Sequence, residues 1–364
     1  MERIMTNRLD RAFERYQSEF EEAALRVLRG SRYILGPELE SFEKAFAAYN
    51  GASYCMGVGN GLDALTLACR ALGVGEGREV IMQGNTFIAS ALAVSAAGGT
   101  PVFVEPDAYY LPDPEAIEAR ITEKTVAVIA VHLYGQTARM DELSELCKRR
   151  GLKLIEDCAQ SHGARCGSRM SGTIGDIGCF SFYPTKNLGA FGDGGAVITD
   201  NEEYARRIRR LRNYGSEQRY HNKELGVNSR LDDIQAALLS VRLSHLDELT
   251  AERREAAAVY DAGIENPKII KPAVREGAEH VYHQYVIRCA QRDELQAYLA
   301  ERGIDTIIHY PIPPHLSEAY AHLGYRKGDL PVTEEYADTV LSIPMYNGIT
   351  RAEQEQVIGA LNEF

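Results

Sequence analysis

Residues 178–200, GCFSFYPTKNLGAFGDGGAVITD, hold two short apolar segments separated by a loop rich in glycine. Each segment is predicted to be a buried strand, because it is short, apolar and bounded by glycine. The loop carries Lys186 among small and apolar residues. A third apolar segment, LKLIED at residues 152–157, is predicted to be a strand that ends in Asp157. This part of the chain therefore predicts a buried sheet with an acid and a lysine near the ends of its strands.

Upstream of this stretch, predicted strands alternate with predicted helices. Helical spacing of apolar residues marks helices at 37–50, 62–72 and 141–150, and Asp113-Pro114 is expected to open a further helix. Strands are predicted at SYCMGV 53–58, EVIM 79–82, TPVFVE 100–105 and TVAVIAVH 125–132. Such alternation is typical of an α/β fold with a parallel or mixed sheet that is covered on both faces.

The pattern of predicted elements changes after about residue 200. Residues 231–260, LDDIQAALLSVRLSHLDELTAERREAAAVY, predict a helical stretch longer than typical globular helices, long enough to connect two domains. Beyond Pro272 we expect strand-like segments at 285–289 and 306–310, a helix at 293–302 and two terminal helices. The length of 364 residues also suggests about two domains. We therefore expect a large domain over residues 1–247 and a smaller α+β domain over residues 248–364.

Composition restricts the class of protein. Hydrophobic residues make up 45% of the chain and charged residues 25%, as in ordinary globular proteins. Forty basic and 52 acidic side chains give a net charge of −12, which argues against nucleic acid or an anionic membrane as a partner. The stretch from Phe87 to Val104 lacks charged residues, but Gly98, Gly99 and Pro101 interrupt it. A buried helix followed by a strand is expected there in place of a membrane span.

The cysteines indicate a reducing compartment. The seven of them lie at positions 55, 69, 147, 158, 166, 179 and 289 and include no C-x-x-C pair. Neither a disulfide framework nor a zinc ribbon is therefore expected. The N-terminal stretch is charged and lacks the apolar core of a signal peptide, so we expect a cytoplasmic protein. His162, His309 and His315 show no spacing typical of metal ligands, and no metal site is expected.

Three candidate groups fit one ligand. The turn GVGNGLDAL, residues 57–65, leads from a predicted strand into a helix whose free N–H groups favour a phosphate. Asp157 needs a partner at its strand end, although capping the following turn would also satisfy it. Lys186, when buried, is a nucleophilic amine that can form Schiff bases, and Ser181 adds a hydroxyl. Pyridoxal phosphate, with its aldehyde, pyridine nitrogen and phosphate, would use all of them.

Five motifs then occur in a telling order: GNGLDAL, NTFIAS, EDCAQSHGA, FSFYPTKNLGAFGDGGA and GVNSRLDDIQAALL. Together they resemble those of the pyridoxal-phosphate-dependent nucleotide-sugar aminotransferases, the DegT/StrS family within aspartate aminotransferase fold type I. The resemblance covers nearly the whole chain, from RYILGPELESFE to LSIPMYNGIT. It implies a three-layer α/β/α fold with a mixed, mostly parallel seven-stranded sheet, plus the smaller C-terminal domain.

The resemblance also implies roles for individual residues. Lys186 looks like the Schiff-base lysine, Asp157 like the partner of the pyridine nitrogen, and Gln160 like a donor to the ring hydroxyl. Phe87 matches the aromatic residue that stacks on the cofactor. The phosphate would be bound by Gly61, Leu62 and Ser181 and, from the second subunit of a homodimer with shared active sites, by Asn228. At position 62 many relatives carry threonine, so a hydroxyl contact to phosphate is lost here.

Simpler roles remain open for several of these residues. Phe87 is also compatible with a place in the core, and Asn228 with a turn or a helix cap. Gln160 is likewise compatible with a purely structural role. The arginine run at residues 206–212 is expected to be mostly a solvated helix surface, with a diphosphate contact by Arg212 as a minor alternative.

The implied reaction moves an amino group from L-glutamate to a keto-sugar nucleotide. EDCAQSHGA, with Gln160, and IIHYPIPPHLSEAY are similar to enzymes that act at C-3 of dTDP-3-keto-6-deoxyhexoses, whereas C-4 enzymes commonly carry histidine at the Gln160 position. The expected product is a dTDP-3-amino-3,6-dideoxyhexose for a glycan such as lipopolysaccharide or for an antibiotic. The candidate substrate-pocket residues are Tyr183, His309, Tyr310 and His315.

Other interpretations stay open at this point. A C-4 keto-sugar nucleotide or a keto-cyclitol is the alternative acceptor. A dehydratase class of the same family replaces the lysine with histidine, so Lys186 argues against it. A non-catalytic regulator would bind the cofactor and drive a partner without performing the reaction. A nicotinamide-dependent dehydrogenase is disfavoured, because GVGNG lacks the G-x-G-x-x-G spacing.

Overall fold

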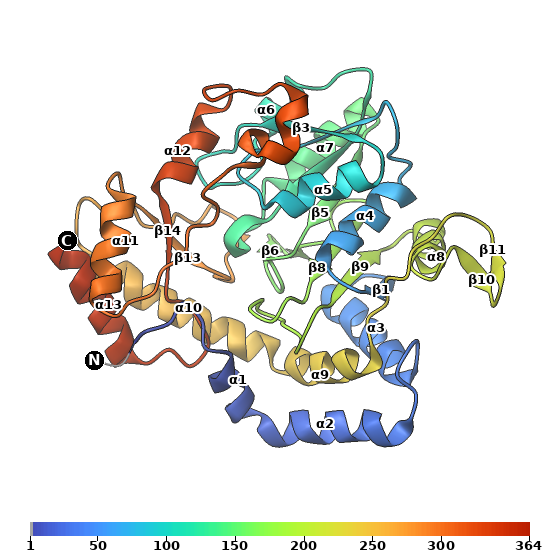
Figure 1. Ribbon diagram of the computed structural model, residues 1–364, viewed down its shortest axis with the longest axis horizontal. Helices are drawn as coiled ribbons and strands as arrows, with labels where there is room; N and C mark the ends of the chain where they lie inside the picture. Colours follow the sequence, from blue (N-terminus) through green and yellow to red (C-terminus); the bar gives the residue numbers. More distant parts are fainter. Residues whose placement is uncertain (1–2) are drawn as a thin grey trace.

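A seven-stranded sheet forms the centre of the structure, a computed structural model that describes residues 3–364 (Figure 1). In spatial order the strands are β1 (Tyr54–Val58), β9 (Gly195–Thr199), β8 (Ile177–Ser181), β5 (Lys153–Asp157), β4 (Thr125–Val131), β2 (Glu79–Gln83) and β3 (Thr100–Val104). β9 is antiparallel to both of its neighbours, and the other strands run parallel to one another. The predicted mixed, mostly parallel sheet is confirmed.

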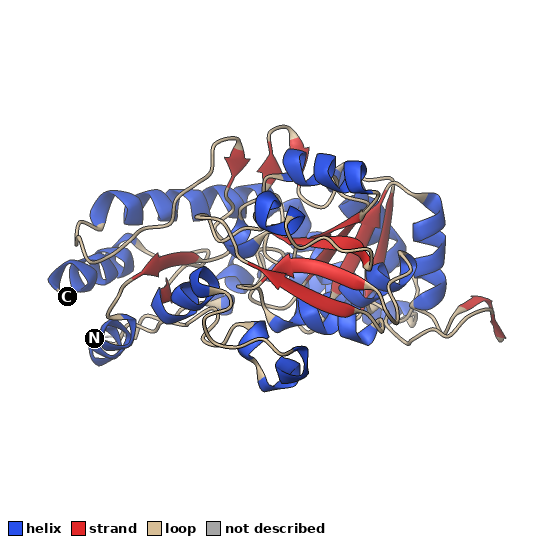
Figure 2. Ribbon diagram, turned by 90° about the horizontal axis from the view of Figure 1, so that it is seen from above, coloured by secondary structure: helices blue, strands red, loops and turns tan. Residues whose placement is uncertain are grey.

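Helices cover both faces of this sheet, as Figure 2 shows. They are α3 (Pro37–Asn50), α4 (Gly61–Ala71), α5 (Ile88–Ala96), α6 (Pro114–Glu118), α7 (Met140–Arg150), α8 (Glu202–Leu211) and α9 (Asp233–Ser244). Side chains alternate along each strand, so Ile129 lies in the core cluster that includes residues of α4, α5 and α8, whereas Val128 lies in the cluster with α6 and α7. On that second face α3 and α9 cover β1, β8 and β9. The expected three-layer α/β/α arrangement is confirmed.

The prediction of one long helix over residues 231–260 is wrong in one respect, because the structure divides this stretch into two helices. α9 ends at Ser244, and α10 (Leu246–Gly263) begins after His245, whose φ of −108° and ψ of 3° are not helical. The His245 ring stacks on Tyr16 with ring centroids 3.9 Å apart, and its Nε2 lies 3.1 Å from a Glu19 carboxylate oxygen. Contacts with the N-terminal helices therefore accompany a break that the local pattern of apolar residues does not reveal.

A second hydrophobic core lies beyond this break. It is built from α10, β13 (Tyr285–Arg288), α11 (Arg292–Glu301), β14 (Val340–Ile343) and α13 (Arg351–Glu363). Ile4 also packs in it, and the Ile4 N–H donates to the Gly303 carbonyl. The expected strand over residues 306–310 makes only a bridge from Ile307 to Ser342. The division at residue 247 stays a prediction, but Ile4 packs with the core that follows it.

The remaining elements surround these two cores. They are α1 (Leu9–Arg15), α2 (Gln17–Gly30), α12 (Pro331–Thr339), the short helices η1 (Leu133–Gly135), η2 (Pro314–Leu316) and η3 (Glu318–Leu323), and the short strands β6 (Arg165–Cys166), β7 (Arg169–Met170) and β12 (Ala278–Glu279). A hairpin of β10 (Ser216–Gln218) and β11 (His221–Asn222) projects away from the seven-stranded sheet and its helices (Figure 1). Within residues 3–364, no helix has both the length and the apolarity needed to cross a bilayer.

Candidate active site

Four of the predicted site residues follow strands whose carboxyl ends meet at one edge of the sheet. Asp157 ends β5 and Ser181 ends β8, while Gly61 begins α4 after β1 and Phe87 caps α5 after β2. These four strands run in the same direction, so the residues share an edge. Open α/β sheets bind their ligands at this edge.

Asp157 is a buried carboxylate with two donors. Its Oδ2 accepts a hydrogen bond from Ser90 Oγ at 2.8 Å, and its Oδ1 accepts one from the Ala159 N–H at 3.1 Å. Burial raises the pKa of the Asp157 carboxyl, and these two donors and the charge of Lys186 offset only part of that rise. The expected cap of the following turn is thus present, but it leaves acceptor capacity on both oxygens for a further donor.

Lys186 lies in a tight turn between β8 and β9. Its N–H donates to the Tyr183 carbonyl at 2.8 Å, and Gly189 is required nearby because a Cβ there would lie 2.2 Å from the Pro184 carbonyl oxygen. Burial lowers the pKa of the Lys186 amine to about 8, while the negative charge of Asp157 opposes that fall. An unprotonated, nucleophilic fraction of the amine is therefore present near neutral pH.

A phosphate-sized anion has a suitable place at the start of α4. Asn60 caps the helix by accepting the Asp63 N–H at 2.8 Å, which leaves the N–H groups of Gly61 and Leu62 without a partner inside the helix. A Cβ on Gly61 would lie 2.6 Å from the Ser181 Cβ, so only glycine lets the two approach. Two backbone donors and a hydroxyl thus lie together at a helix N-terminus. The structure brings together three of the predicted phosphate ligands: Gly61, Leu62 and Ser181.

Gln160 joins the sheet edge to the segment that carries Tyr310. Its Oε1 accepts the Tyr134 N–H at 2.6 Å, and its Nε2 donates to the Tyr310 hydroxyl at 3.1 Å. The Tyr310 ring in turn lies 5.0 Å from the Phe87 ring, measured between centroids. Phe87 is 50% exposed, so a place in the core is excluded. One face of this ring remains available for stacking.

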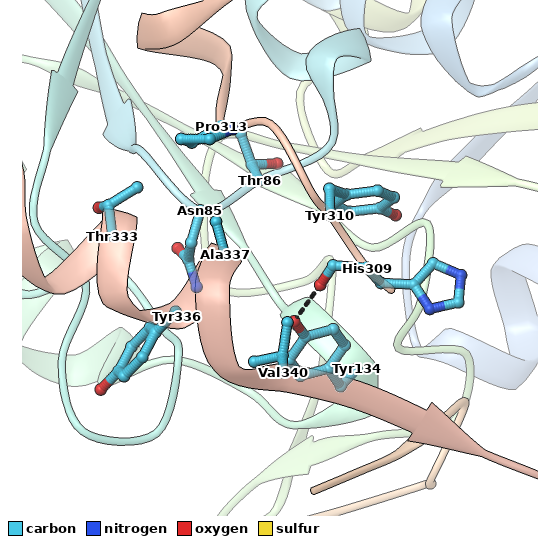
Figure 3. Close-up of a pocket in the computed structure, with 10 residues that line it drawn as sticks. All are labelled: Asn85, Thr86, Tyr134, His309, Tyr310, Pro313, Thr333, Tyr336, Ala337 and Val340. Carbon is cyan, nitrogen blue, oxygen red and sulfur yellow. Dashed lines mark hydrogen bonds between the residues drawn. The ribbon is translucent and has the colours of Figure 1, made fainter. Parts of the chain in front are cut away.

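Figure 3 shows a small pocket beside Tyr310. Tyr134, whose hydroxyl donates to the His309 carbonyl at 2.5 Å, lines it together with residues of α12 and of the loop after β2. Asn85 also lines the pocket, and its Oδ1 is buried without a hydrogen-bond partner among the described residues. Two of the four predicted pocket residues, His309 and Tyr310, are thus placed at a cavity.

The side chains of three other predicted residues do not line this pocket. His315 is buried with its Nε2 3.2 Å from a Glu334 carboxylate oxygen, and it does not line the pocket of Figure 3. Tyr183 is exposed. Asn228 is exposed too, and its backbone forms a bridge with Asn213. The cap of α9 is Asp232, so the helix-cap alternative for Asn228 is wrong.

The minor alternative for Arg212 is also wrong. Its guanidinium is buried and donates to Glu43 Oε1 at 2.5 Å and to the Gly57 carbonyl at 2.7 Å. A diphosphate would have to displace both partners. Arg212 therefore braces β1 against α3.

Several residues at the site were missed in the sequence. Ser90, the donor to Asp157, lies one helical turn after Phe87 inside the motif NTFIAS, and that spacing was the available signal. Asn85 lies in the same motif and lines the pocket of Figure 3. Tyr134 and His283 carry no local signal, because distant segments of the chain bring them to the site.

One group of potential metal ligands is already saturated by the protein. His132, Glu156 and Cys158 are buried with ligand atoms within 4.8 Å of one another. Glu156 accepts hydrogen bonds from the backbone of Gly172, Ile174 and Gly175, and its Oε2 lies 2.9 Å from His132 Nε2. Both of its oxygens are thus occupied, so this cluster is a structural network.

The shared strand-end edge, the partly buried lysine with its lowered pKa and the buried aspartate define an enzyme of the aminotransferase class. The chain belongs to the DegT/DnrJ/EryC1/StrS aminotransferase family, whose model matches residues 14–362. The resemblance seen in the sequence motifs is confirmed.

Individual relatives support the same assignment. The chain is 50% identical over 351 residues to dTDP-3-amino-3,6-dideoxy-alpha-D-galactopyranose transaminase of Aneurinibacillus thermoaerophilus, covering 96% of both chains. It is 49% identical over 358 residues to dTDP-3-amino-3,4,6-trideoxy-alpha-D-glucose transaminase of Streptomyces venezuelae, covering 98% of this chain and 94% of the relative. The crystal structure of S. venezuelae DesV in complex with a ketimine intermediate matches with a TM-score of 0.98 and 48% identity, covering 100% of this chain and 98% of that one. The expected fold is confirmed.

Proposed function

We propose that this protein uses pyridoxal phosphate to transfer an amino group from L-glutamate to C-3 of a dTDP-3-keto-6-deoxyhexose. The product is a dTDP-3-amino-3,6-dideoxyhexose for a glycan, such as lipopolysaccharide, or for an antibiotic. The observation that carries the chemistry is the pair formed by Lys186 and Asp157, in which a lysine of lowered pKa and a buried, incompletely saturated carboxylate lie at one sheet edge.

The residues present fit pyridoxal phosphate. The phosphate matches the free N–H groups of Gly61 and Leu62 and the Ser181 hydroxyl, held together by the close approach that only glycine allows. The pyridine nitrogen matches Asp157, whose oxygens have room for another donor. Phe87 offers an exposed aromatic face for the ring, and the Gln160 amide is held at the same edge.

When bound, this cofactor supplies an aldehyde that reacts with amines and a ring that accepts electrons. Asp157 keeps a proton on the pyridine nitrogen, and Ser90 orients that carboxylate through its hydrogen bond. Lys186 Nζ takes the proton from the Cα atom of glutamate and later returns a proton to the sugar carbon that receives the nitrogen. Its lowered pKa makes the unprotonated amine available for the first of these steps.

The choice of C-3 rests on the relatives and on Gln160. Two relatives at about half identity over nearly the whole chain are named as transaminases that form 3-amino sugars. They differ from each other at C-4 of the sugar, which is deoxygenated in the name of the second. Gln160, held by Tyr134 and Tyr310, occupies the position where histidine would favour a C-4 keto-sugar. The pocket beside His309 and Tyr310 is the proposed sugar subsite.

We propose the remaining features on the same basis. The active form is a homodimer in which the exposed Asn228 of a second subunit completes the phosphate site. No nucleic acid or membrane takes part, in keeping with the net charge of −12. The enzyme acts in the cytoplasm and needs no metal.

The visible absorption spectrum of the protein with pyridoxal phosphate tests both half-reactions. We expect a yellow band that disappears with L-glutamate and returns with dTDP-3-keto-6-deoxyglucose or with its C-4 epimer. Return of the band only with a C-4 keto-sugar nucleotide or a keto-cyclitol would replace the proposed acceptor. A band that does not respond to glutamate would favour a non-catalytic, cofactor-binding regulator. Lys186→Ala should lose turnover by about 10⁴-fold with an unchanged circular dichroism spectrum.

A further inference from the structure

A histidine just before β13 lies beside the lysine. His283 Nε2 is 3.5 Å from Lys186 Nζ. His283 is buried, and it immediately precedes the segment that enters β13. The remaining ring nitrogen, Nδ1, is also buried and has no hydrogen-bond partner among residues 3–364. The lysine is therefore the one hydrogen-bonding contact recorded for this ring within the described chain.

The backbone around His283 is attached to the lysine loop on one side. Asn187, the residue after Lys186, donates from its amide nitrogen to the Val281 carbonyl at 2.9 Å. The Val281 N–H donates to the Gly135 carbonyl at 2.9 Å. A Cβ on Gly135, whose φ is +108°, would lie 3.0 Å from the backbone nitrogen of His283. The segment 281–283 is thus held against the residues that position the lysine.

The other side is fixed by a buried arginine of α10. Arg253 donates from its Nη1 to the carbonyls of Tyr282 and His283, at 3.0 and 3.3 Å. Its Nε donates to the Asn347 side chain at 3.0 Å, so the guanidinium itself is fixed. The backbone of His283 is therefore held in place beside the lysine loop.

The charges around His283 keep its ring neutral. Burial lowers the pKa of His283 well below its usual value, and the positive charges of Lys186 and Arg253 lower it further. His309 and His162 face the same region, and their pKa values are also lowered by burial, to about 4 and about 3. Asp157 is the acidic group near Lys186. A histidine in this setting stays neutral near neutral pH, so one of its ring nitrogens can accept a hydrogen bond.

We propose that His283 is a positioning residue for Lys186, whose amine it holds through a hydrogen bond to Nε2 whenever that amine is free. This inference deepens the proposed function and rests on it for its place in the reaction. An ammonium group can only donate, so Nε2 is the acceptor and the ring proton lies on Nδ1. The hydrogen bond keeps the lysine near the reacting carbon between its two proton transfers.

The pKa of Lys186 in the cofactor-free protein tests this contact directly. Competitive labelling with acetic anhydride over a range of pH, followed by mass spectrometry of the peptide that contains Lys186, measures that pKa without any substrate. In His283→Leu we expect the pKa to fall by about one unit, because the charged amine loses its acceptor. In His283→Gln, which retains an acceptor, the fall should be less than about half a unit.

Kinetics provide a second readout. His283→Leu should lower kcat about tenfold and change the KM for glutamate less than about threefold, and His283→Gln should recover part of the loss. His280→Gln is the matched control, because His280 is a buried ring in the same segment whose Nδ1 accepts the Tyr282 N–H and does not contact Lys186. That control should leave the Lys186 pKa unchanged.

An unchanged Lys186 pKa in folded His283→Leu would overturn the inference. If that variant does not fold, His283→Asn serves in its place, because its shorter amide does not reach Nζ. The two proposals fail separately. A wild-type protein that does not transaminate overturns the proposed function while the labelling result still decides on the His283 contact. A normal transaminase with no pKa change overturns the positioning role alone.

Discussion

Glu156 and Asp157 are neighbours on β5, and both are buried carboxylates, but the protein supplies more hydrogen-bond partners to Glu156 than to Asp157. Glu156 accepts three backbone N–H groups and contacts His132, so these donors outweigh burial and its pKa falls below the usual value. Asp157 has only two donors, so burial prevails and its pKa rises. Successive residues of a strand point to opposite faces, and each face supplies a different set of donors.

This difference separates a structural carboxylate from a functional one. A buried acid whose acceptor sites are filled stabilises the loop that fills them, here residues 172–175. A buried acid with unfilled acceptor sites is unfavourable by itself and becomes favourable when a ligand brings the missing donor. We therefore expect substitutions at the two positions to separate activity from stability.

Asp157→Asn should have the largest effect on activity. The amide cannot hold a proton on the pyridine nitrogen, and we expect kcat to fall about 10³-fold. The apparent melting temperature of the cofactor-free protein should stay the same or rise, because an incompletely solvated buried charge is removed. Steady-state kinetics and thermal unfolding measure the two effects. A clear loss of cofactor-free stability would show that Asp157 is mainly structural.

Glu156→Gln should show the reverse pattern. Its amide nitrogen cannot accept the backbone N–H groups of residues 172–175, so we expect unfolding to become about 2–4 kcal/mol easier. The folded fraction should keep kcat within about tenfold of the wild type. Urea unfolding and active-site titration check this, with Glu123→Gln, at an exposed turn position, as a control that should change neither value. A large loss of kcat in fully folded Glu156→Gln would show that Glu156, like Asp157, is needed for activity.

The pH dependence of stability should have opposite signs at the two positions. The folded pKa of Glu156 is lowered, so its contribution is present above the unfolded pKa near about 4.5 and is lost as pH falls. The folded pKa of Asp157 is raised, so its unfavourable contribution is relieved as pH falls. Below about pH 5, stability should decline less steeply in Glu156→Gln than in the wild type, and between about pH 7 and pH 4 it should decline more steeply in Asp157→Asn. Thermal unfolding of the cofactor-free proteins at several pH values measures these slopes. Equal slopes of stability against pH in the wild type and both variants would contradict the prediction.

Ser90→Ala should produce the smallest effect. It removes the donor to Asp157 Oδ2, so the pKa of Asp157 should rise further and kcat should fall about threefold to tenfold. Ser240→Ala is a matched control, because that hydroxyl donates only to a carbonyl of its own helix, α9. The pH profile of kcat measures the shift. A profile that matches the control would mean that Ser90 does not tune Asp157.

Much of the central sheet could be predicted from the sequence because its signals are local. Short apolar runs such as 152–157 and 178–183 identify strands wherever they are buried, and parallel strands bring their carboxyl ends to one edge. Asp157 and Lys186 were therefore identifiable as a pair. The His245 break was not, because the contacts found at it come from Tyr16 and Glu19, more than 200 positions away.

The site shows the same limit. Ser90 lay inside a recognised motif, and its contact with Asp157 needed only the position of α5 against β5. His283 and Tyr134 reach the site through contacts between distant segments, for which a single sequence contains no pattern. His315 looked like a pocket residue beside His309, but the short helix η2 turns its ring toward Glu334.

The packing of Ile4 has a consequence for folding during synthesis. All strands of the central sheet have left the ribosome once residue 199 has emerged, so that sheet can form early. The smaller core joins Ile4 to Leu361, and it cannot close until nearly all of the printed sequence has been made. Ile4 must therefore wait for Leu361, and during that delay its side chain is exposed apolar surface that a chaperone can bind.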